Sequence, residues 1–172
     1  MPATYTLISS NVLTSSAASV TFSSIPSTYT DLVLKISSRN SSTGDFQHWI
    51  NFNSDTGTTY SATWMYGTGA AANSTSVFDN IRLRAGYINS DSTTSNTFCS
   101  TEIYIPNYTV SASKPISVFG ATENNAASDR TLVSAWADLW RNNATISTIA
   151  IAPSSGNYVS GSSFYLYGIS NA

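Results

Sequence analysis

The sequence predicts an all-β protein, an antiparallel β-sandwich of the jelly-roll type, on three observations. From Ser19 to Ile169, apolar and small polar residues alternate almost without a break, which places every second side chain on one face of a pleated sheet. Turn residues, chiefly Gly, Pro, Asn and Ser, interrupt this alternation at short intervals. The intervening segments lack the amphipathic helices that connect parallel strands, so the roughly ten expected strands should pair antiparallel.

Each expected strand keeps one face apolar and ends at turn residues. In the segment 45–53, for example, His48 shares a face with the alternating apolar residues, and Trp49 lies on the opposite face. Pro26 ends the first strand because proline removes a backbone donor. Gly168 in the last strand indicates either a close backbone approach or a β-bulge. The expected strands cover residues 19–25, 31–39, 45–53, 60–66, 77–87, 98–105, 116–122, 132–140, 146–152 and 164–169.

Two segments are less clearly patterned than the others. Leu132, Ala135 and Leu139 follow a helical spacing, so a helix stays an alternative to a strand for residues 132–140. The segment Gly67–Ser74 is composed of small residues, mainly glycine and alanine, and is expected to be a mobile loop.

The length of 172 residues is that of a single domain. A chain of this size buries roughly 70% of its unfolded surface without disulfides. Residues 19–172 are therefore expected to form one sandwich, and the weakly patterned residues 1–18 an N-terminal arm or an edge strand. Cys99 is the only cysteine and is expected to be a small buried hydrophobe.

The charge content argues against several classes of function. Asp, Glu, Lys and Arg make up 9% of the residues, and the formal net charge is −2. Nucleic-acid binding requires a basic surface, so nucleic acid is not an expected partner. No run approaches the roughly 18 apolar residues of a membrane span, and the first residues do not resemble a signal peptide. We therefore expect no membrane association, and synthesis in the cytoplasm of the host cell.

Residues able to carry out catalysis are scarce. His48 and Cys99 are the one combination suited to a nucleophile and its base, but the more common interpretation is a half-buried strand histidine satisfied by a neighbouring Ser or Asn. The acidic loops 53–55 and 124–129 lack EF-hand spacing. A glycosidase would place two carboxylates across a cleft, and the candidates are Asp79, Glu102, Glu123 and Asp138. We expect no enzyme, no catalytic residues, no cofactor and no metal.

Arginine and aromatic residues are the remaining functional material. Arg82 and Arg84 fall on the same face of an expected strand, as in a small anion or partner site, although such pairs are commonly solvated. Aromatic residues make up 12% of the chain, and their rings suit either a protein interface or stacking on sugars. Several rings are expected to be exposed, because one sandwich interior does not hold rings from both faces of the same strands.

Four stretches of the chain resemble a group of small virion structural proteins from tailed bacteriophages, especially phages of aquatic hosts. The segments that carry this resemblance are Thr4–Ser10, Phe22–Leu32, Asn51–Ser61 and Ile146–Ile169. The order of the segments and the closing Leu-Tyr-Gly-Ile are the specific part of the match. Residues 67–96 and 136–143 match no pattern of the group and are the places where partner choice is expected to differ.

The resemblance implies a jelly-roll capsid decoration protein, also called a cement protein. Such a protein is a structural component of the virion that binds the major capsid protein on the outside of the shell, and a homotrimer is the expected assembly. Related sandwiches occur in tail and fibre components. The alternative is therefore a carbohydrate-binding adhesin module of a tail fibre, which would stack exposed rings on host glycans.

Partner contacts are expected at the N-terminal arm and at aromatic and basic side chains. An extended arm can add a strand to the sheet edge of another chain. The residues expected to contact partners are Thr4, Tyr5, Leu7, Ile8, Trp64, Tyr66, Arg82, Arg84, Trp136 and Trp140.

Overall fold

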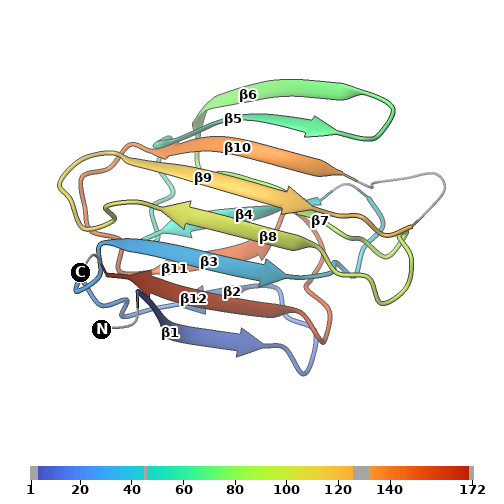
Figure 1. Cartoon of the computed structure of the whole chain (residues 1–172), viewed down its shortest axis with the longest axis horizontal. Coiled ribbons are helices and arrows are strands. Elements are labelled where there is room, and N and C mark those ends of the chain that lie inside the picture. Colours follow the sequence, from blue (N-terminus) through green and yellow to red (C-terminus); the bar gives the residue numbers. More distant parts are fainter. Residues whose placement is uncertain (1–3, 45, 126–131, 171–172) are drawn as a thin grey trace.

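The protein is a sandwich of two antiparallel β-sheets, which confirms the predicted all-β fold (Figure 1). The computed structural model describes residues 4–44, 46–125 and 132–170. Figure 1 shows an eight-stranded sheet, here the large sheet, in front of a four-stranded small sheet. The jelly-roll type of connectivity stays a prediction.

The strands of both sheets lie in an order that differs from their order in the sequence. Side by side, the large sheet contains β1 (Tyr5–Val12), β12 (Ser163–Ile169), β3 (Asp31–Ser37), β8 (Ser100–Ile105), β9 (Lys114–Ala121), β10 (Val133–Trp140), β5 (Tyr60–Gly67) and β6 (Ala72–Asn80). The small sheet contains β2 (Val20–Phe22), β11 (Ile149–Pro153), β4 (Phe46–Phe52) and β7 (Leu83–Ile88). The large sheet therefore ends in β1 on one side and in β6 on the other.

The core lies between the sheets and consists of the side chains on the inward face of the alternating strands. Strand β4 alternates buried and half-buried residues along its whole length, with His48 buried and Trp49 half-buried on the opposite face. The predicted pattern is confirmed for residues 46–52, while residue 45 lies outside the described residues. Period-two burial is what a strand with one face on the core requires.

Aromatic pairs on adjacent strands fill the core beneath β5 and β10. Trp64 and Trp136 lie directly opposite each other, and their rings stack with centroids 4.4 Å apart. Tyr60 and Trp140 lie opposite each other four residues farther along the same two strands, and Trp140 also packs on Phe52 of the small sheet at 5.3 Å. Such cross-strand aromatic contacts stabilise both the pairing and the sheet-to-sheet packing.

The segment 132–140 is a strand, and the helical alternative is wrong. Strand β10 pairs with β9 on one side and β5 on the other over all eight of its residues. Its buried residues, such as Trp136 and Trp140, recur with period two. Pairing on both sides satisfies the backbone groups that an isolated helix would satisfy internally.

The predicted loop over Gly67–Ser74 is also wrong. Strand β5 runs to Gly67, a short turn follows in which the Thr68 amide donates to the Ala71 carbonyl, and β6 begins at Ala72. Every residue of β6 is exposed or half-buried. The small polar residues that suggested a loop are those of an edge strand with solvent on both faces.

The predicted single strand over 77–87 is two strands in different sheets. The register between β5 and β6 shifts near the end of β6, where Asp79 has a φ of 53°. The chain then turns at Ile81, whose carbonyl accepts a hydrogen bond from the side-chain Nδ2 of Asn51 at 2.9 Å. It next enters β7 in the small sheet. A β-bulge of this kind ends strand pairing and redirects the chain.

The N-terminal segment is part of the sandwich. Strand β1 pairs antiparallel with β12 from Tyr5 to Val12 and forms one edge of the large sheet. Ala17 makes a bridge to Tyr158. Residues 1–3 lie outside the described residues, so the part of the expected arm that precedes Thr4 is not placed.

Gly168 marks a close approach, as expected for a glycine within a strand, and the pairing there is regular. It lies opposite Thr6 on one side and Leu32 on the other. A Cβ atom at this position would overlap the ring of Tyr29, well inside van der Waals contact. The ring therefore packs on the bare backbone of the last strand.

We expect Gly168→Ala to lower the free energy of unfolding by about 1–3 kcal/mol, because the added methyl group must displace the Tyr29 ring. Gly67→Ala is the matched control, since its Cβ would meet only a Val133 methyl group at the ordinary distance of 3.6 Å. The control should change stability by less than about 0.5 kcal/mol. Urea denaturation of both variants measures the difference, and equal stabilities would contradict the close approach.

Candidate interaction surfaces

The outer face of the large sheet, meaning the side chains that point away from the small sheet, is a surface that the register defines residue by residue. One row of directly paired residues crosses all eight strands: Ser10, Tyr165, Lys35, Glu102, Phe119, Ala135, Met65 and Ser74. A second row lies beside it: Leu7, Tyr167, Val33, Tyr104, Ser117, Ala137, Thr63 and Ser76. Only two side chains in these rows are charged.

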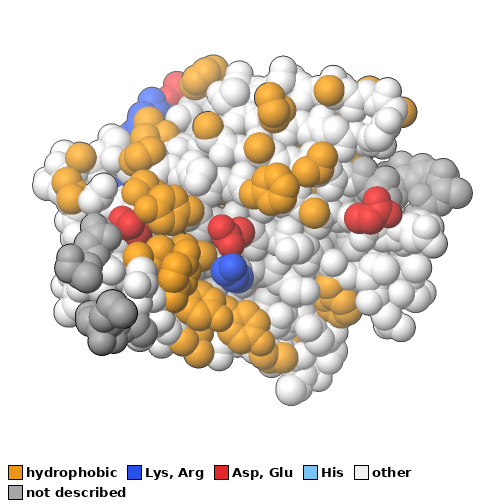
Figure 2. All heavy atoms as spheres, in the orientation of Figure 1, with side chains coloured by type: hydrophobic (Ala, Val, Ile, Leu, Met, Phe, Trp, Pro, Cys, Tyr) orange, Lys and Arg blue, Asp and Glu red, His pale blue; other side chains and the backbone are white. Residues whose placement is uncertain are grey.

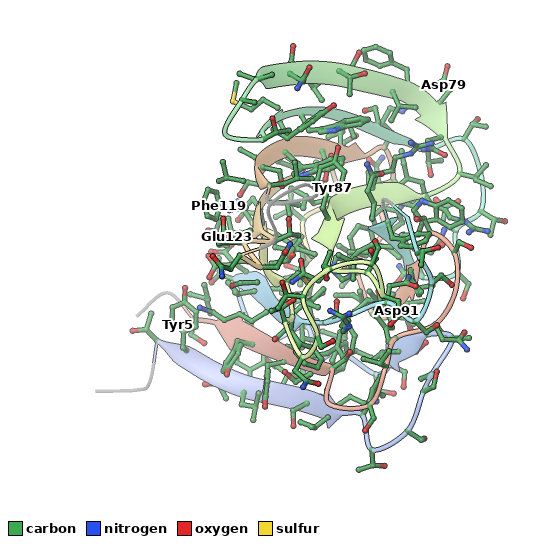
Figure 3. The ribbon with its side chains drawn as sticks, turned by 90° about the vertical axis from the view of Figure 1, so that its right-hand side faces the viewer. Tyr5, Asp79, Tyr87, Asp91, Phe119 and Glu123 are labelled. Atoms are coloured by element: carbon green, nitrogen blue, oxygen red, sulfur yellow. The ribbon has the colours of Figure 1, made fainter. Side chains whose placement is uncertain are left out.

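Large apolar side chains stand exposed on this outer face. The exposed fractions are 53% for Tyr5, 51% for Leu7, 62% for Met65, 60% for Phe119 and 50% for Val133. Figure 2 shows a band of apolar side chains over the region of β1, β12 and β3, and Figure 3 shows Tyr5 and Phe119 projecting from the same side of the molecule. Exposed apolar side chains gathered on one face are typical of a surface that binds a partner.

A shallow apolar groove runs along β10 within the outer face. Ala135 and Ala137 form its floor because their side chains are too short to fill the space between the neighbouring strands. Phe119 on β9 and Met65 on β5 form its walls. The groove consists of two adjoining hollows of about 450 and 300 Å³. Its shape suits an inserted apolar side chain or an extended segment.

One ion pair lies in the middle of the outer face. Lys35 Nζ and Glu102 Oε2 are 2.9 Å apart, and both side chains are about half exposed. The hydrogen bond to Glu102 raises the pKa of Lys35. An exposed pair of this kind contributes only about 0–1 kcal/mol to stability. The pair adds no net charge to the face and leaves contacts to be made largely by apolar atoms.

Both edges of the large sheet carry unpaired backbone groups. Strand β1 contains no proline and no charged residue, and β6 contains only Asp79 at its far end. Natural edge strands commonly carry lysine, proline or inward charges that prevent pairing with another chain. The β5–β6 hairpin lies at the opposite end of the sheet from β1 in Figure 1. The two edges are therefore open to strand addition.

The tryptophans predicted to be exposed binding rings are buried, and that prediction is wrong. Trp64, Trp136 and Trp140 are 7%, 3% and 0% exposed. They point inward because they occupy the core-facing positions of β5 and β10, where they pack on one another. Tyr66 is half-buried, with its ring edge-on to Tyr87 at 5.5 Å.

The predicted N-terminal contacts divide between the two faces of β1. Tyr5 and Leu7 lie on the outer face, where Tyr5 packs edge-on against the ring of Tyr167 at 6.3 Å. Ile8 is half-buried against the core, and Thr4 is exposed with its carbonyl bonded to the Ser170 amide. Two of the four residues are thus placed to touch a partner on the outer face.

Arg82 and Arg84 lie together on the outer face of the small sheet. Arg84 is directly opposite Trp49 in the β4–β7 register, and the Arg82 guanidinium lies over the Trp49 ring, 4.5 Å from its centroid. The two arginines are on the opposite side of the sandwich from the apolar outer face of the large sheet.

His48 and Cys99 do meet, but inside the core. Cys99 Sγ is 3.8 Å from His48 Nε2, and both residues are at most 1% exposed. Burial lowers the pKa of His48 to about 3 and raises the pKa of the Cys99 thiol, so both groups are neutral near pH 7. No substrate reaches this pair without unfolding the sandwich.

The environment expected for His48 is corrected by the structure. The residue is fully buried and not half-buried, and its partner is the Tyr158 hydroxyl, 2.8 Å from Nδ1, in place of a Ser or Asn. Cys99 is buried as predicted and lies 3.3 Å from the Ser38 hydroxyl. The cluster satisfies the polar atoms that these residues bring into the core.

The four acidic residues considered for glycoside hydrolysis have separate surroundings. Glu102 pairs with Lys35, Asp79 pairs with Arg141, and Glu123 accepts hydrogen bonds from the amides of the next two residues. Asp138 is 4% exposed, and neither of its carboxylate oxygens has a hydrogen-bond partner among the described residues. Burial raises the pKa of Asp138 to about 8.

Asp55, from the predicted acidic loop, has a structural role. Its carboxylate accepts hydrogen bonds from Trp140 Nε1 at 2.8 Å and from the Thr59 hydroxyl at 2.9 Å. Burial favours a higher pKa for Asp55, but hydrogen bonds from Trp140, Gly57, Thr59 and Asn142 outweigh it and lower the pKa. Within the described part of the chain, no three His, Cys, Asp or Glu side chains are grouped as metal ligands would be.

Sequence reasoning missed three of the exposed apolar residues on the outer face of the large sheet, namely Met65, Phe119 and Val133. Each lies in an alternating segment at a position opposite in phase to the buried residues. The one available indication was their position in the alternation: an apolar residue on the polar face of a strand does not point into the core.

Comparison with protein-family models finds no match, and a search of curated proteins finds no significant relative. Among the described residues, no helix has the length and apolar character needed to cross a membrane. The function is therefore inferred from the surfaces described above.

Asp138 and His48 should give the protein a pH-dependent stability of defined sign. The folded pKa of Asp138, about 8, lies above its ordinary 3.8, so its contribution is complete below pH 4 and is lost as the pH rises to 8. The folded pKa of His48, about 3, lies below its ordinary 6.5, so its contribution is complete above pH 6.5 and is lost as the pH falls to 3.

We therefore expect the contributions of Asp138 and His48 to the free energy of unfolding to change in opposite directions between pH 4 and 6.5. From pH 6.5 to 8, the free energy of unfolding should fall by about 1.4 kcal/mol per pH unit. Asp138→Asn removes the titrating carboxyl and should abolish that fall, whatever its effect on absolute stability. Urea denaturation at half-unit pH steps measures both slopes. A parent protein whose stability does not change between pH 6.5 and 8 would show that Asp138 is ionised in the fold.

Proposed function

We propose that the protein is a structural component of a bacteriophage virion, a capsid decoration protein that binds the major capsid protein on the outside of the shell. The observation that carries the proposal is the outer face of the large sheet, where exposed apolar side chains share a broad surface with a single ion pair. The sequence resemblance to small virion structural proteins supplies the class of partner. The scarcity of accessible catalytic groups is consistent with an adhesive role.

Binding would work through repetition. Each copy would bury apolar atoms of the outer face across a joint between capsid subunits, with Phe119 and Met65 beside the β10 groove as anchors. Modest affinity at each contact becomes strong retention when an oligomer engages several subunits at once. A contact made mainly by apolar side chains also makes such retention depend only weakly on salt, because little ionic attraction is screened.

The two open edges of the large sheet support self-assembly into the homotrimer that the resemblance implies. Strand β1 of one copy would pair with β6 of the next, a head-to-tail contact that closes into a ring when the rotation between copies permits it. Main-chain hydrogen bonds between edge strands are a common source of such affinity.

In solution we expect a particle of three times the chain mass of 18.3 kDa, measured by light scattering after gel filtration. Thr75→Lys places a charge in the middle of the exposed edge strand β6 and should yield monomers. Ser117→Lys, on the central strand β9, is the control and should leave the assembly intact. A monomeric parent protein would rule out the trimer.

Docking through the outer face is tested with phage that carry Met65→Lys and Phe119→Lys together, because neither residue is on an edge strand. We expect roughly tenfold or greater loss of copies per particle, because two exposed apolar contacts become charged. Val110→Lys is the control, since Val110 is also 50% exposed but lies in the turn between β8 and β9. Quantitative gel analysis against the major capsid protein gives the copy number.

Two outcomes would contradict the docking proposal. One is an unchanged copy number in the double variant, and the other is a label on this chain that appears at the tail tip and not over the whole shell. The second outcome would favour the tail-fibre adhesin. Trp64, Trp136 and Trp140, which were expected to contact partners, are buried, so the adhesin would need a different glycan site.

A further inference from the structure

The outer face of the small sheet carries two arginines, Arg82 and Arg84, and the guanidinium of Arg82 stacks on the Trp49 ring. Among the described residues, the other cations are all engaged: Lys35 with Glu102, Arg141 with Asp79, and Arg39 and Lys114 with backbone carbonyls. Neither Arg82 nor Arg84 has an ion pair or a hydrogen bond there. The Nε atom of Arg84 is moreover buried with no hydrogen-bond partner.

These arginines border a hollow that is fixed in shape by its surroundings. The hollow has a volume of about 200 Å³ and is lined by Trp49, Asn80, Ile81, Arg82 and Arg84. Strand β7 positions Arg84, and the turn that carries Arg82 is anchored by the Asn51 amide through the Ile81 carbonyl. A site built on a strand and an anchored turn loses little entropy when a ligand binds.

The guanidinium groups select the charge of the ligand. A planar carboxylate matches the fork of an arginine, and hydrogen bonds between charged partners are the strong ones. In a chain with a net charge of −2 and few cations, two arginines that line one hollow and form no ion pair among the described residues are a local positive site.

The other residues of the hollow indicate which kind of molecule would bear the carboxylate. The indole of Trp49 is half-buried and partly covered by the Arg82 guanidinium, and its remaining exposed part offers an aromatic surface for the C–H groups of a sugar ring. The side-chain amide of Asn80 also lines the hollow: its Oδ1 accepts a hydrogen bond from the Ile81 N–H at 2.8 Å, and its Nδ2 group is suited to a sugar hydroxyl. A volume of about 200 Å³ is below that of a whole drug-sized site and suits one sugar residue.

We propose that Arg82, Arg84 and Trp49 form a binding site for a uronic acid residue of an acidic polysaccharide. The carboxylate would be held by the two guanidinium groups, and the ring would lie against the indole. The site is on the opposite side of the sandwich from the outer face of the large sheet, so it stays accessible if that face docks on a capsid. The proposal does not depend on the docking role.

The test uses the full chain and three acidic tetrasaccharides, of galacturonate, of alginate and of hyaluronan, with methyl-esterified tetragalacturonate as the uncharged counterpart. Trp49 is the half-buried tryptophan, and the other three are at most 7% exposed. Binding should therefore protect tryptophan fluorescence from quenching by acrylamide, and titration calorimetry gives the affinity. We expect binding of at least one acidic oligomer, and weaker binding at higher salt.

Arg82→Gln should weaken that binding roughly tenfold or more, because it removes a charged hydrogen-bond donor. Arg84→Gln should do the same, and its thermal unfolding shows whether the fold is kept. Lys35→Gln is the matched control: it removes the same charge from the opposite face and should bind as the parent chain does.

Several results would overturn the proposal. The first is that no acidic oligomer binds. The second is that the methyl ester binds as tightly as the acidic oligomer. The third is that Arg82→Gln and Lys35→Gln bind the acidic oligomer with equal affinity. Tighter binding of a tetraglutamate peptide would assign the site to an acidic protein. Equal affinity for inorganic phosphate would show that the arginines bind small anions without selecting a sugar.

Discussion

The unequal width of the two sheets is the constraint on which the rest of the structure depends. The packing of apolar rows between sheets stabilises the fold, but a four-stranded sheet covers only part of an eight-stranded one. Strand β6, for example, has no buried residue at all. The mismatch leaves an extended sheet with open edges, and these surplus surfaces are where adhesion is proposed.

Much of the fold was accessible from the sequence because burial on one face of a strand imposes a period of two. Strand β4 follows this rule without exception. The rule failed at β6, where no core is present to impose alternation, and at residues 77–87, where the positive φ of Asp79 ends a strand within an apolar-looking run. Strand β10 needed its partners on both sides to exclude a helix.

The candidate surfaces were harder to predict, because exposure depends on which face of each strand meets the other sheet. Trp64 and Trp136 were expected outside and lie inside, while Phe119 was overlooked and lies outside. Composition does not distinguish these cases, and only the phase of each strand relative to the core does. The pairing of Arg82 and Arg84 on one face was visible in sequence, but the adjacent Trp49 comes from another strand.

The place of β12 determines the order in which strands of the large sheet can pair. This strand, Ser163–Ile169, is the last in the sequence, yet it lies between β1 and β3 near the start. The ladder that joins β1 to β3 through β12 therefore forms only after β12 has been synthesised. Non-local pairing of this kind is slow. Until β12 is in place, the edges of β1 and β3 that it covers are open to pairing with other chains.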